Sequence, residues 1–476
     1  MLNQNQQSVV ACDMSGFLPC FRKPVTLDMQ CGRCEKAVQV DGNTFRNALG
    51  KLTVKWRGFR RAPIFTLRKR WRKIQEKRSQ NRLERAADQI VGAIEKRDYD
   101  RAVKLYRSLI REETAADQIY AVAPRWMKDA GLTEAFHRAC VDSLKYPELR
   151  EMIYSVANGD KLYRPSQFWQ FFATYHALQL DIWTVENFKR TVNNGYYQWS
   201  REVAFITQTI AIEKLLSSPA PELSTGEKPE KFSKKKWRLY LQFLAALFQY
   251  ARETDTHGLC DKVTESEFGN PIGASLNGRL VTQDLCNSII EVNTILDAAS
   301  LDTSKPFRVM ELGAGHGRVM FTILKAFPHA QIAIVDIPPA LFVSQWYLTN
   351  TFPGLKAFKW RAFRNYEDIK SEFEGASIAF LSPEQIELIP DKCADLFVNI
   401  SSLHEMMMPQ IQNWFSHIDR VCRGYFYTKQ IKEYPNLIDN ITVRESDYPV
   451  NPRWQETLKR TNPIFPIFFE GVYRIP

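Results

Sequence analysis

The chain has 476 residues, of which 45% are hydrophobic and 25% charged, ordinary proportions for a globular protein of two or three domains. It contains no run of about 18 apolar residues, so we predict no transmembrane helix, and the N-terminus lacks the features of a signal peptide. The net charge is +11, but residues 46–86 alone hold fifteen Lys/Arg and two Asp/Glu, so the remainder is close to neutral. We therefore expect a cytoplasmic protein with reduced cysteines and one basic segment.

Residues 1–45 are polar and irregular, and we expect a disordered tail. The pair Cys31 and Cys34, in the string CGRC, resembles half of a zinc knuckle. A suitable second pair is missing, because Cys12 and Cys20 are too far apart and no histidine lies near. We therefore interpret these cysteines as free thiols and predict no metal site.

Residues 46–86 form the basic segment, in which aromatic residues such as Trp56 and Trp71 alternate with Lys and Arg. Three interpretations fit this composition. The segment is a solvated helix face with a tail, it contacts an anionic membrane surface, or it binds nucleic acid through phosphate contacts. We favour the first, keep peripheral membrane contact as the alternative, and do not expect nucleic acid.

Residues 87–255 are predicted to be a helical domain. Apolar residues recur at spacings of three and four in stretches such as residues 97–110 and 133–144. Residues 165–183 are richer in aromatic residues, as a buried helix would be. We expect this domain to shape the pocket for a second substrate.

Residues 256–476 show a different pattern, in which short apolar runs alternate with helical stretches. Strands alternating with helices of about 10–15 residues indicate βαβ units. We therefore predict an α/β fold with a Rossmann-like, mainly parallel sheet and helices on both faces. The predicted strands are FRVMEL, AQIAIVDI, SIAFLS, ADLFVNIS, GYFYTKQI and FFEGVYRI.

The string ELGAGHGR follows the first predicted strand and places Gly313, Gly315 and Gly317 in the turn before a helix. Glycine allows the backbone to bend sharply and approach a ligand closely. Asp336 ends the second strand, where a carboxylate can accept hydrogen bonds from both ribose hydroxyls. Ala314 and Ile337 lie beside these residues. The pattern therefore predicts a site for a cofactor that carries a ribose.

NAD and S-adenosylmethionine both carry a ribose, and Glu311 distinguishes them. A pyrophosphate favours a positive helix start, and an acid at the end of the first strand would repel it. S-adenosylmethionine has no phosphate and carries an ammonium and a sulfonium group, which suit an acid. We therefore predict S-adenosylmethionine as the cofactor.

The fourth predicted strand delivers SSLHEM to the edge of the sheet where ligands of such folds bind. Methyl transfer to a hydroxyl needs alignment of the acceptor and removal of its proton. His404 and Glu405 are the candidate catalytic bases. Asn399 and Ser401 are expected to flank the sulfonium and the acceptor.

Four stretches together resemble the S-adenosylmethionine-dependent sugar O-methyltransferases of bacterial polysaccharide gene clusters. They are residues 269–291, ELGAGHGR with VDIPPALFVSQWYLTNTFP, ADLFVNISSLHEM and GYFYTKQ. The resemblance covers roughly residues 160–476. It implies a class I methyltransferase fold, a sugar hydroxyl as methyl acceptor, and closure of residues 269–291 over the site. In that family glutamine usually occupies the position of His404, so Glu405 is the safer assignment.

The sequence thus predicts an S-adenosylmethionine-dependent O-methyltransferase that acts on a sugar of a polysaccharide, glycolipid or nucleotide-sugar precursor. The alternatives are a natural-product hydroxyl or nucleic acid as the acceptor, or a non-catalytic scaffold in glycan assembly. The sequence makes no prediction of the oligomeric state.

Overall fold

The computed structural model describes residues 80–111, 130–192, 234–276, 278–436 and 438–476. The predicted tail, residues 1–45, and most of the basic segment lie outside this part of the chain. The described residues belong to one compact unit, Arg78–Pro476. None of the helices in this part combines the length and the apolar character that crossing a bilayer requires.

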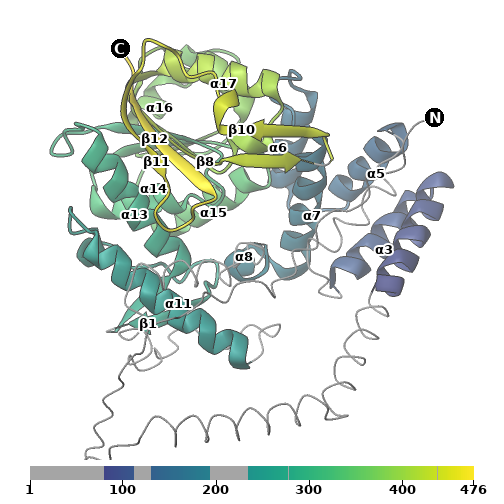
Figure 1. The fold of residues 1–476 in the computed structure, drawn as a ribbon. Coiled ribbons are helices and arrows are strands. Elements are labelled where there is room, and N and C mark those ends of the chain that lie inside the picture. Colours follow the sequence, from purple (N-terminus) through teal and green to yellow (C-terminus); the bar gives the residue numbers. More distant parts are fainter. Residues whose placement is uncertain (1–79, 112–129, 193–233, 277, 437) are drawn as a thin grey trace, which may run out of the picture. The chain divides into compact units, whose positions relative to one another are not determined.

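Helices dominate the part of the chain before the sheet (Figure 1). Residues 80–95 are helical, and the further elements are α3 Tyr99–Arg111, α5 Ala130–Asp142, α6 Pro147–Asn158, α7 Gln167–Trp183, η2 Val185–Asn187, α8 Phe188–Thr191, α11 Lys234–Glu253 and α12 Leu259–Lys262. Helix α7 begins after Ser166, whose hydroxyl accepts a hydrogen bond from the backbone N–H of Trp169. The carboxylate of Asp439 accepts hydrogen bonds from the first two backbone N–H groups of the helix, those of Gln167 and Phe168. The start of α7 is thereby fixed to the C-terminal part of the chain.

A short antiparallel hairpin precedes the main sheet and leads directly into a long helix. Strands β1, Gly273–Leu276, and β2, Arg279–Thr282, form the hairpin, and α13, Gln283–Ala298, follows. The hydroxyl of Thr282 accepts a hydrogen bond from the N–H of Leu285 and so caps α13.

The main sheet has eight strands within the described residues. Their order is β11-β12-β8-β7-β3-β4-β6-β5. The bounds are β3 Arg308–Leu312, β4 Gln331–Val335, β5 Ala357–Phe358, β6 Ile378–Leu381, β7 Ala394–Ile400, β8 Cys422–Ile431, β11 Gln455–Thr461 and β12 Phe468–Arg474. Strands β3 to β8 pair in parallel, whereas β12 is antiparallel to both β8 and β11. A parallel sheet with one reversed strand inserted near its end is the class I methyltransferase arrangement, and the predicted fold class is confirmed.

Helices cover both faces of the sheet, because successive strand residues point to opposite sides. Val398 of β7 packs in one core with α13, α14 (Arg318–Ala326) and α15 (Ala340–Thr351). Its neighbour Phe397 packs in the opposite core with α16 (Lys370–Gly375) and α17 (Met408–Val421). The remaining elements are η4 Tyr366–Asp368, η5 Pro383–Leu388, η6 Leu403–Glu405, β9 Glu433–Asn436, β10 Ile441–Arg444 and η7 Glu445–Asp447.

Candidate active site

The glycine loop connects β3 to α14, and its three glycines adopt positive φ angles of 69°, 62° and 83°. A Cβ at Gly313 would lie 2.3 Å from the hydroxyl of Ser402, so this glycine lets the loop pack against the end of β7. Gly317 is the N-cap residue of α14. A Cβ at Gly315 would meet no atom within 4 Å, and this residue lies on the wall of a cavity. The loop therefore presents open backbone to that cavity.

Asp336 follows the last residue of β4 and holds the glycine loop in place. One carboxylate oxygen accepts a hydrogen bond from the N–H of Gly315 at 2.9 Å, and the other accepts from Ile337 at 2.7 Å. The side chain is buried, and this burial raises the pKa of Asp336 to about 7. Each carboxylate oxygen can accept a second hydrogen bond, so Asp336 can still receive two hydroxyl groups.

Glu311 lies on β3, directly before the loop, and is 2% exposed. Burial raises the pKa of Glu311 to about 8, and its Oε2 has no hydrogen-bond partner among the described residues. A buried carboxyl without a full set of partners is costly unless a ligand compensates it. A cationic ligand group nearby would stabilise the ionised form. Glu311 therefore fits a cofactor whose amino-acid end carries positive charge.

Asn399 ends up beneath the loop rather than on the cavity wall. It is fully buried, and its amide donates hydrogen bonds to the carbonyl of Leu312 and to the hydroxyl of Ser402. Gln430 of β8 donates in turn to the Asn399 side-chain oxygen. Asn399 thus ties the ends of β3 and β7 together, and Ser401 and Ser402, which line the cavity, are the groups that can reach a ligand.

The two predicted bases have different surroundings. The ring of His404 is 1% exposed, packs against Tyr434 with centroids 4.6 Å apart and bonds through Nδ1 to Gln430 at 2.9 Å. Burial lowers the pKa of His404 to about 4, so the ring is neutral, and it does not line the cavity. Glu405 does line it.

Glu405 is held by a helix that lies far away in sequence. Its Oε2 accepts a hydrogen bond from the indole N–H of Trp169 on α7 at 3.0 Å. Burial raises the pKa of Glu405 to about 8. A carboxylate with a pKa near neutrality can both take up and release a proton. This environment favours Glu405 over His404 as the base.

The cavity has a volume of about 340 Å³ and is lined by residues from several separate segments of the chain. Of the predicted site residues, it brings together Gly313, Ala314, Gly315, Asp336, Ile337, Ser401 and Glu405. Glu311, Gly317, Asn399 and His404 are not on its wall. Residues of helix α13 and of the segment 162–169 also line the cavity.

Four further residues on the wall were not predicted from sequence: Trp169, Glu291, Arg318 and Lys429. Arg318 directly follows the last glycine of the loop, and Lys429 belongs to the quoted string GYFYTKQ, so both lay within recognised stretches. Glu291 is the last residue of the quoted stretch 269–291, whereas Trp169 lies on a helix whose apolar pattern gave no sign of a site.

Comparison with solved structures finds methyltransferases. An S-adenosylmethionine-dependent methyltransferase from Aquifex aeolicus is 9% identical over 48% of this chain and 98% of its own, with a TM-score of 0.26. A Burkholderia thailandensis 1,6-didemethyltoxoflavin-N1-methyltransferase with bound S-adenosylhomocysteine is 14% identical over 40% of this chain and 78% of its own, with a TM-score of 0.28. A Leishmania major S-adenosylmethionine-dependent methyltransferase is 14% identical over 48% of this chain and 82% of its own, also with a TM-score of 0.28.

At such low scores these likenesses carry no weight for activity, and the strand order and site described above identify the fold. No protein-family model matches the sequence, and the comparison with curated proteins finds no match.

Proposed function

We propose that this protein is an S-adenosylmethionine-dependent O-methyltransferase whose acceptor is a sugar hydroxyl. The observation that supports it most is that Gly315, Asp336 and Glu405 all line a single cavity. The first pair suits the backbone approach and the ribose of the cofactor, and Glu405 suits removal of a proton from a hydroxyl.

The cofactor would supply an electrophilic methyl group on its sulfonium. The protein would provide the rest. Asp336 would accept hydrogen bonds from the ribose hydroxyls, and Glu311 would favour a positive charge near the loop. Glu405 would take the proton of the acceptor hydroxyl, while Trp169 keeps its carboxylate oriented. Segment 162–169 and α13 would exclude water from the cavity.

A sugar acceptor is supported by the resemblance of residues 160–476 to sugar O-methyltransferases and by the composition of the wall. Trp169, Phe465 and Phe468 offer apolar ring faces, and Gln283 and Asn287 offer amide groups. Sugar rings need both kinds of contact, an apolar face and many hydrogen bonds.

The test is calorimetric titration of the full chain with S-adenosylhomocysteine and with NAD. We expect micromolar binding of the first only, and at least tenfold weaker binding by an Asp336→Ala variant. The acceptor would then be sought by following transfer of a labelled methyl group to nucleotide sugars and oligosaccharides. If S-adenosylhomocysteine did not bind, the proposal would be wrong.

A further inference from the structure

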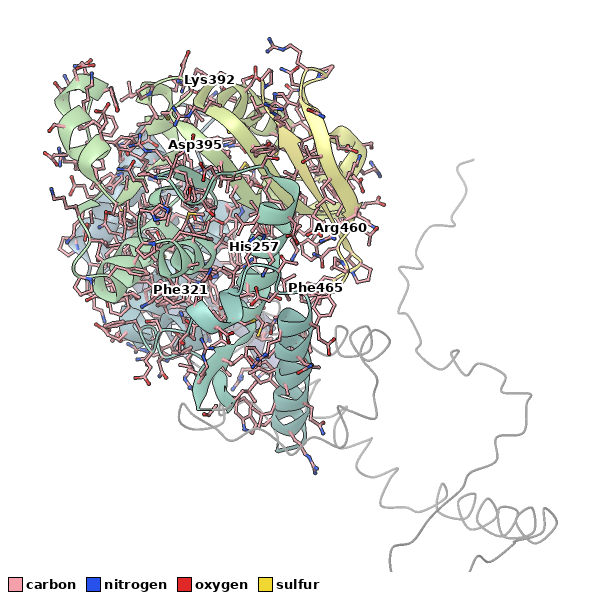
Figure 2. All side chains as sticks on the ribbon, turned by 90° about the vertical axis from the view of Figure 1, so that its left-hand side faces the viewer. His257, Phe321, Lys392, Asp395, Arg460 and Phe465 are labelled. Atoms are coloured by element: carbon pink, nitrogen blue, oxygen red, sulfur yellow. The ribbon has the colours of Figure 1, made fainter. Side chains whose placement is uncertain are left out.

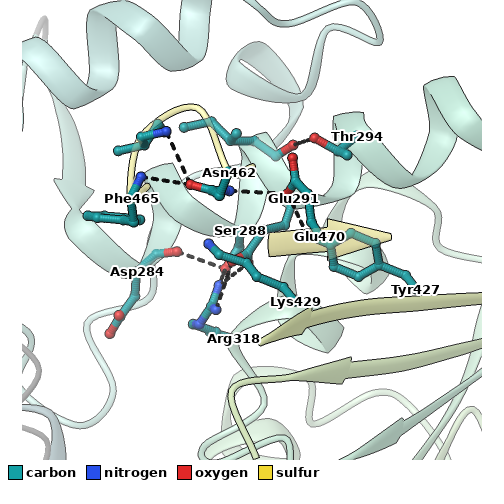
Figure 3. Close-up of polar contacts among 12 residues, drawn as sticks. Asp284, Ser288, Glu291, Thr294, Arg318, Tyr427, Lys429, Asn462, Phe465 and Glu470 are labelled. Atoms are coloured by element: carbon teal, nitrogen blue, oxygen red, sulfur yellow. Dashed lines mark hydrogen bonds and ion pairs between the residues drawn. The ribbon is translucent and has the colours of Figure 1, made fainter. Parts of the chain in front are cut away.

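A cluster of charged residues from α13, the start of α14 and β8 lines the cavity (Figure 3). Glu291 is 1% exposed and stands between two cations. Its Oε1 accepts a hydrogen bond from Lys429 Nζ at 2.9 Å, and its two oxygens accept from both terminal nitrogens of Arg318 at 2.5 and 3.2 Å. Ser288 accepts a further hydrogen bond from Arg318. We call Glu291, Arg318 and Lys429 the charged triad.

The charged triad has an excess of one positive charge, because one carboxylate faces two cations. Two other carboxyl groups face Arg318, those of Asp284 and Glu311. Burial raises the pKa of both, which disfavours their charged forms. The nearby cation Lys189 has its own partner, Glu265, at 2.8 Å. Uncompensated charge in a buried site is costly, so an anionic ligand group would be stabilised here.

Lys429 also has hydrogen-bonding capacity to spare. Its ammonium carries three N–H donors, yet within the described part of the chain it makes one hydrogen bond, to Glu291. The rings of Phe465 and Phe468 lie 5.3 and 5.5 Å from Nζ and shield it from water. Since Lys429 is 6% exposed and lines the cavity, its remaining donors are available to a ligand there.

Phe465 precedes β12 and Phe468 is its first residue, and this part of the chain is held against α13. Arg460, labelled near Phe465 in Figure 2, belongs to β11 and donates a hydrogen bond to the hydroxyl of Thr294 on that helix. Asn462 accepts hydrogen bonds from the N–H groups of Ile464 and Phe465, and it donates to Glu470 of β12. The wall around Lys429 is therefore preorganised, as a binding site requires.

Helix α13 adds neutral polar groups to the same wall. Gln283, Asn287 and Glu291 lie four residues apart and thus on one helix face. The side-chain oxygens of Gln283 and Asn287 are buried and have no hydrogen-bond partner among the described residues. These amides can orient a polar ligand that the two cations hold.

We propose that Lys429 and Arg318 form a carboxylate-binding subsite of this cavity. The inference rests on the proposed function, since it assigns one anionic group of a ligand that enters the methyltransferase site. Two sources of a carboxylate exist for that reaction. One is the amino-acid end of the cofactor, and the other is an acidic acceptor such as a uronic acid.

The experiment compares S-adenosylhomocysteine with its decarboxylated analogue by calorimetry on the full-length protein, on Lys429→Met and on Lys429→Arg. Lys432→Met is the matched control, because Lys432 does not line the cavity and donates a hydrogen bond to Thr461. A second titration adds glucuronate or glucose to protein saturated with S-adenosylhomocysteine. Thermal unfolding of each variant shows whether it is folded.

If the cofactor supplies the carboxylate, decarboxylation weakens binding about tenfold or more in the wild type, and Lys429→Met removes that difference. If the acceptor supplies it, S-adenosylhomocysteine binds all variants alike. Glucuronate then binds more tightly than glucose, and Lys429→Met abolishes this preference while Lys429→Arg keeps it. The comparison of ligands on the wild-type protein remains a valid test even if a variant fails to fold.

The subsite proposal is overturned if the wild type binds S-adenosylhomocysteine and its decarboxylated analogue equally and does not prefer glucuronate to glucose. An equal loss in Lys429→Met and Lys432→Met would also overturn it. If the wild type binds no S-adenosylhomocysteine at all, it is the proposed function that fails.

Discussion

The indole N–H of Trp169 donates a hydrogen bond to the Glu405 carboxylate at 3.0 Å, across 236 positions of sequence. This contact joins helix α7 to the segment that follows strand β7. It places a carboxyl group with a pKa of about 8 inside the cavity. The candidate base is thus positioned by the helical part of the chain, outside the sheet that would bind the cofactor.

Replacing Glu405 should change how stability depends on pH. Because the folded-state pKa lies near 8 and that of the unfolded chain near 4.5, the carboxyl makes the protein less stable as pH rises between these values. Glu405→Gln should therefore flatten this slope and, at pH 8, raise the stability by up to about 4 kcal/mol. Thermal unfolding from pH 5 to 8 measures it, with Glu384→Gln as a control. A slope unchanged by the substitution would mean that Glu405 titrates normally.

The two glycines Gly313 and Gly315 should respond differently to alanine. In Gly313→Ala the new Cβ would clash with Ser402, so we expect a loss of stability of about 3 kcal/mol or more. Gly315→Ala meets open space, so its cost is the positive φ alone, about 1–2 kcal/mol.

Binding should show the distinct effect of Gly315→Ala, because its methyl group points into the cavity. We expect its affinity for S-adenosylhomocysteine to fall at least tenfold while the protein stays folded. Denaturant unfolding and calorimetry together test this pair. Normal ligand affinity in Gly315→Ala would show that the loop does not contact the cofactor.

The affinity for S-adenosylhomocysteine should depend on the ionisation of Asp336. Burial raises its pKa to about 7, and the ionised carboxylate is the better acceptor for ribose hydroxyls. Binding should therefore strengthen as pH rises from 6 to 8. Asp336→Asn, which keeps the shape, should bind about tenfold more weakly at pH 8 and lose most of this pH dependence. A pH profile that Asp336→Asn leaves intact would assign the dependence to another group.

Ligand binding should release protons at pH 7. Glu311 and Glu405 have pKa values of about 8 and are largely protonated there, and a cationic ligand favours their ionised forms. S-adenosylmethionine carries a sulfonium that S-adenosylhomocysteine lacks, so it should release more protons. Titrations in buffers with different ionisation enthalpies measure this number. Equal release by both ligands would place the sulfonium away from these carboxyl groups.

Edge elements show where the sequence signal was weak. The six predicted strands are present, whereas the two edge strands of the main sheet, β5 and β11, were missed. Strand β11, QETLKRT, has almost all of its side chains exposed, so no apolar alternation marks it. The paired strand β12 is buried on the sheet and has the apolar run that the prediction used.

What the sequence determined by itself was the α/β fold and the half of the site that is local in the chain. The glycine loop, Glu311 and Asp336 lie within 26 residues of one another, and backbone conformation and strand order place them together. The tertiary structure decided what came from distant segments. It buried His404 and Asn399, exposed Glu405 to the cavity, and brought Trp169, Glu291 and Lys429 to the same cavity. Those placements depend on side-chain packing between α7, α13 and β8, which no local pattern of residues records.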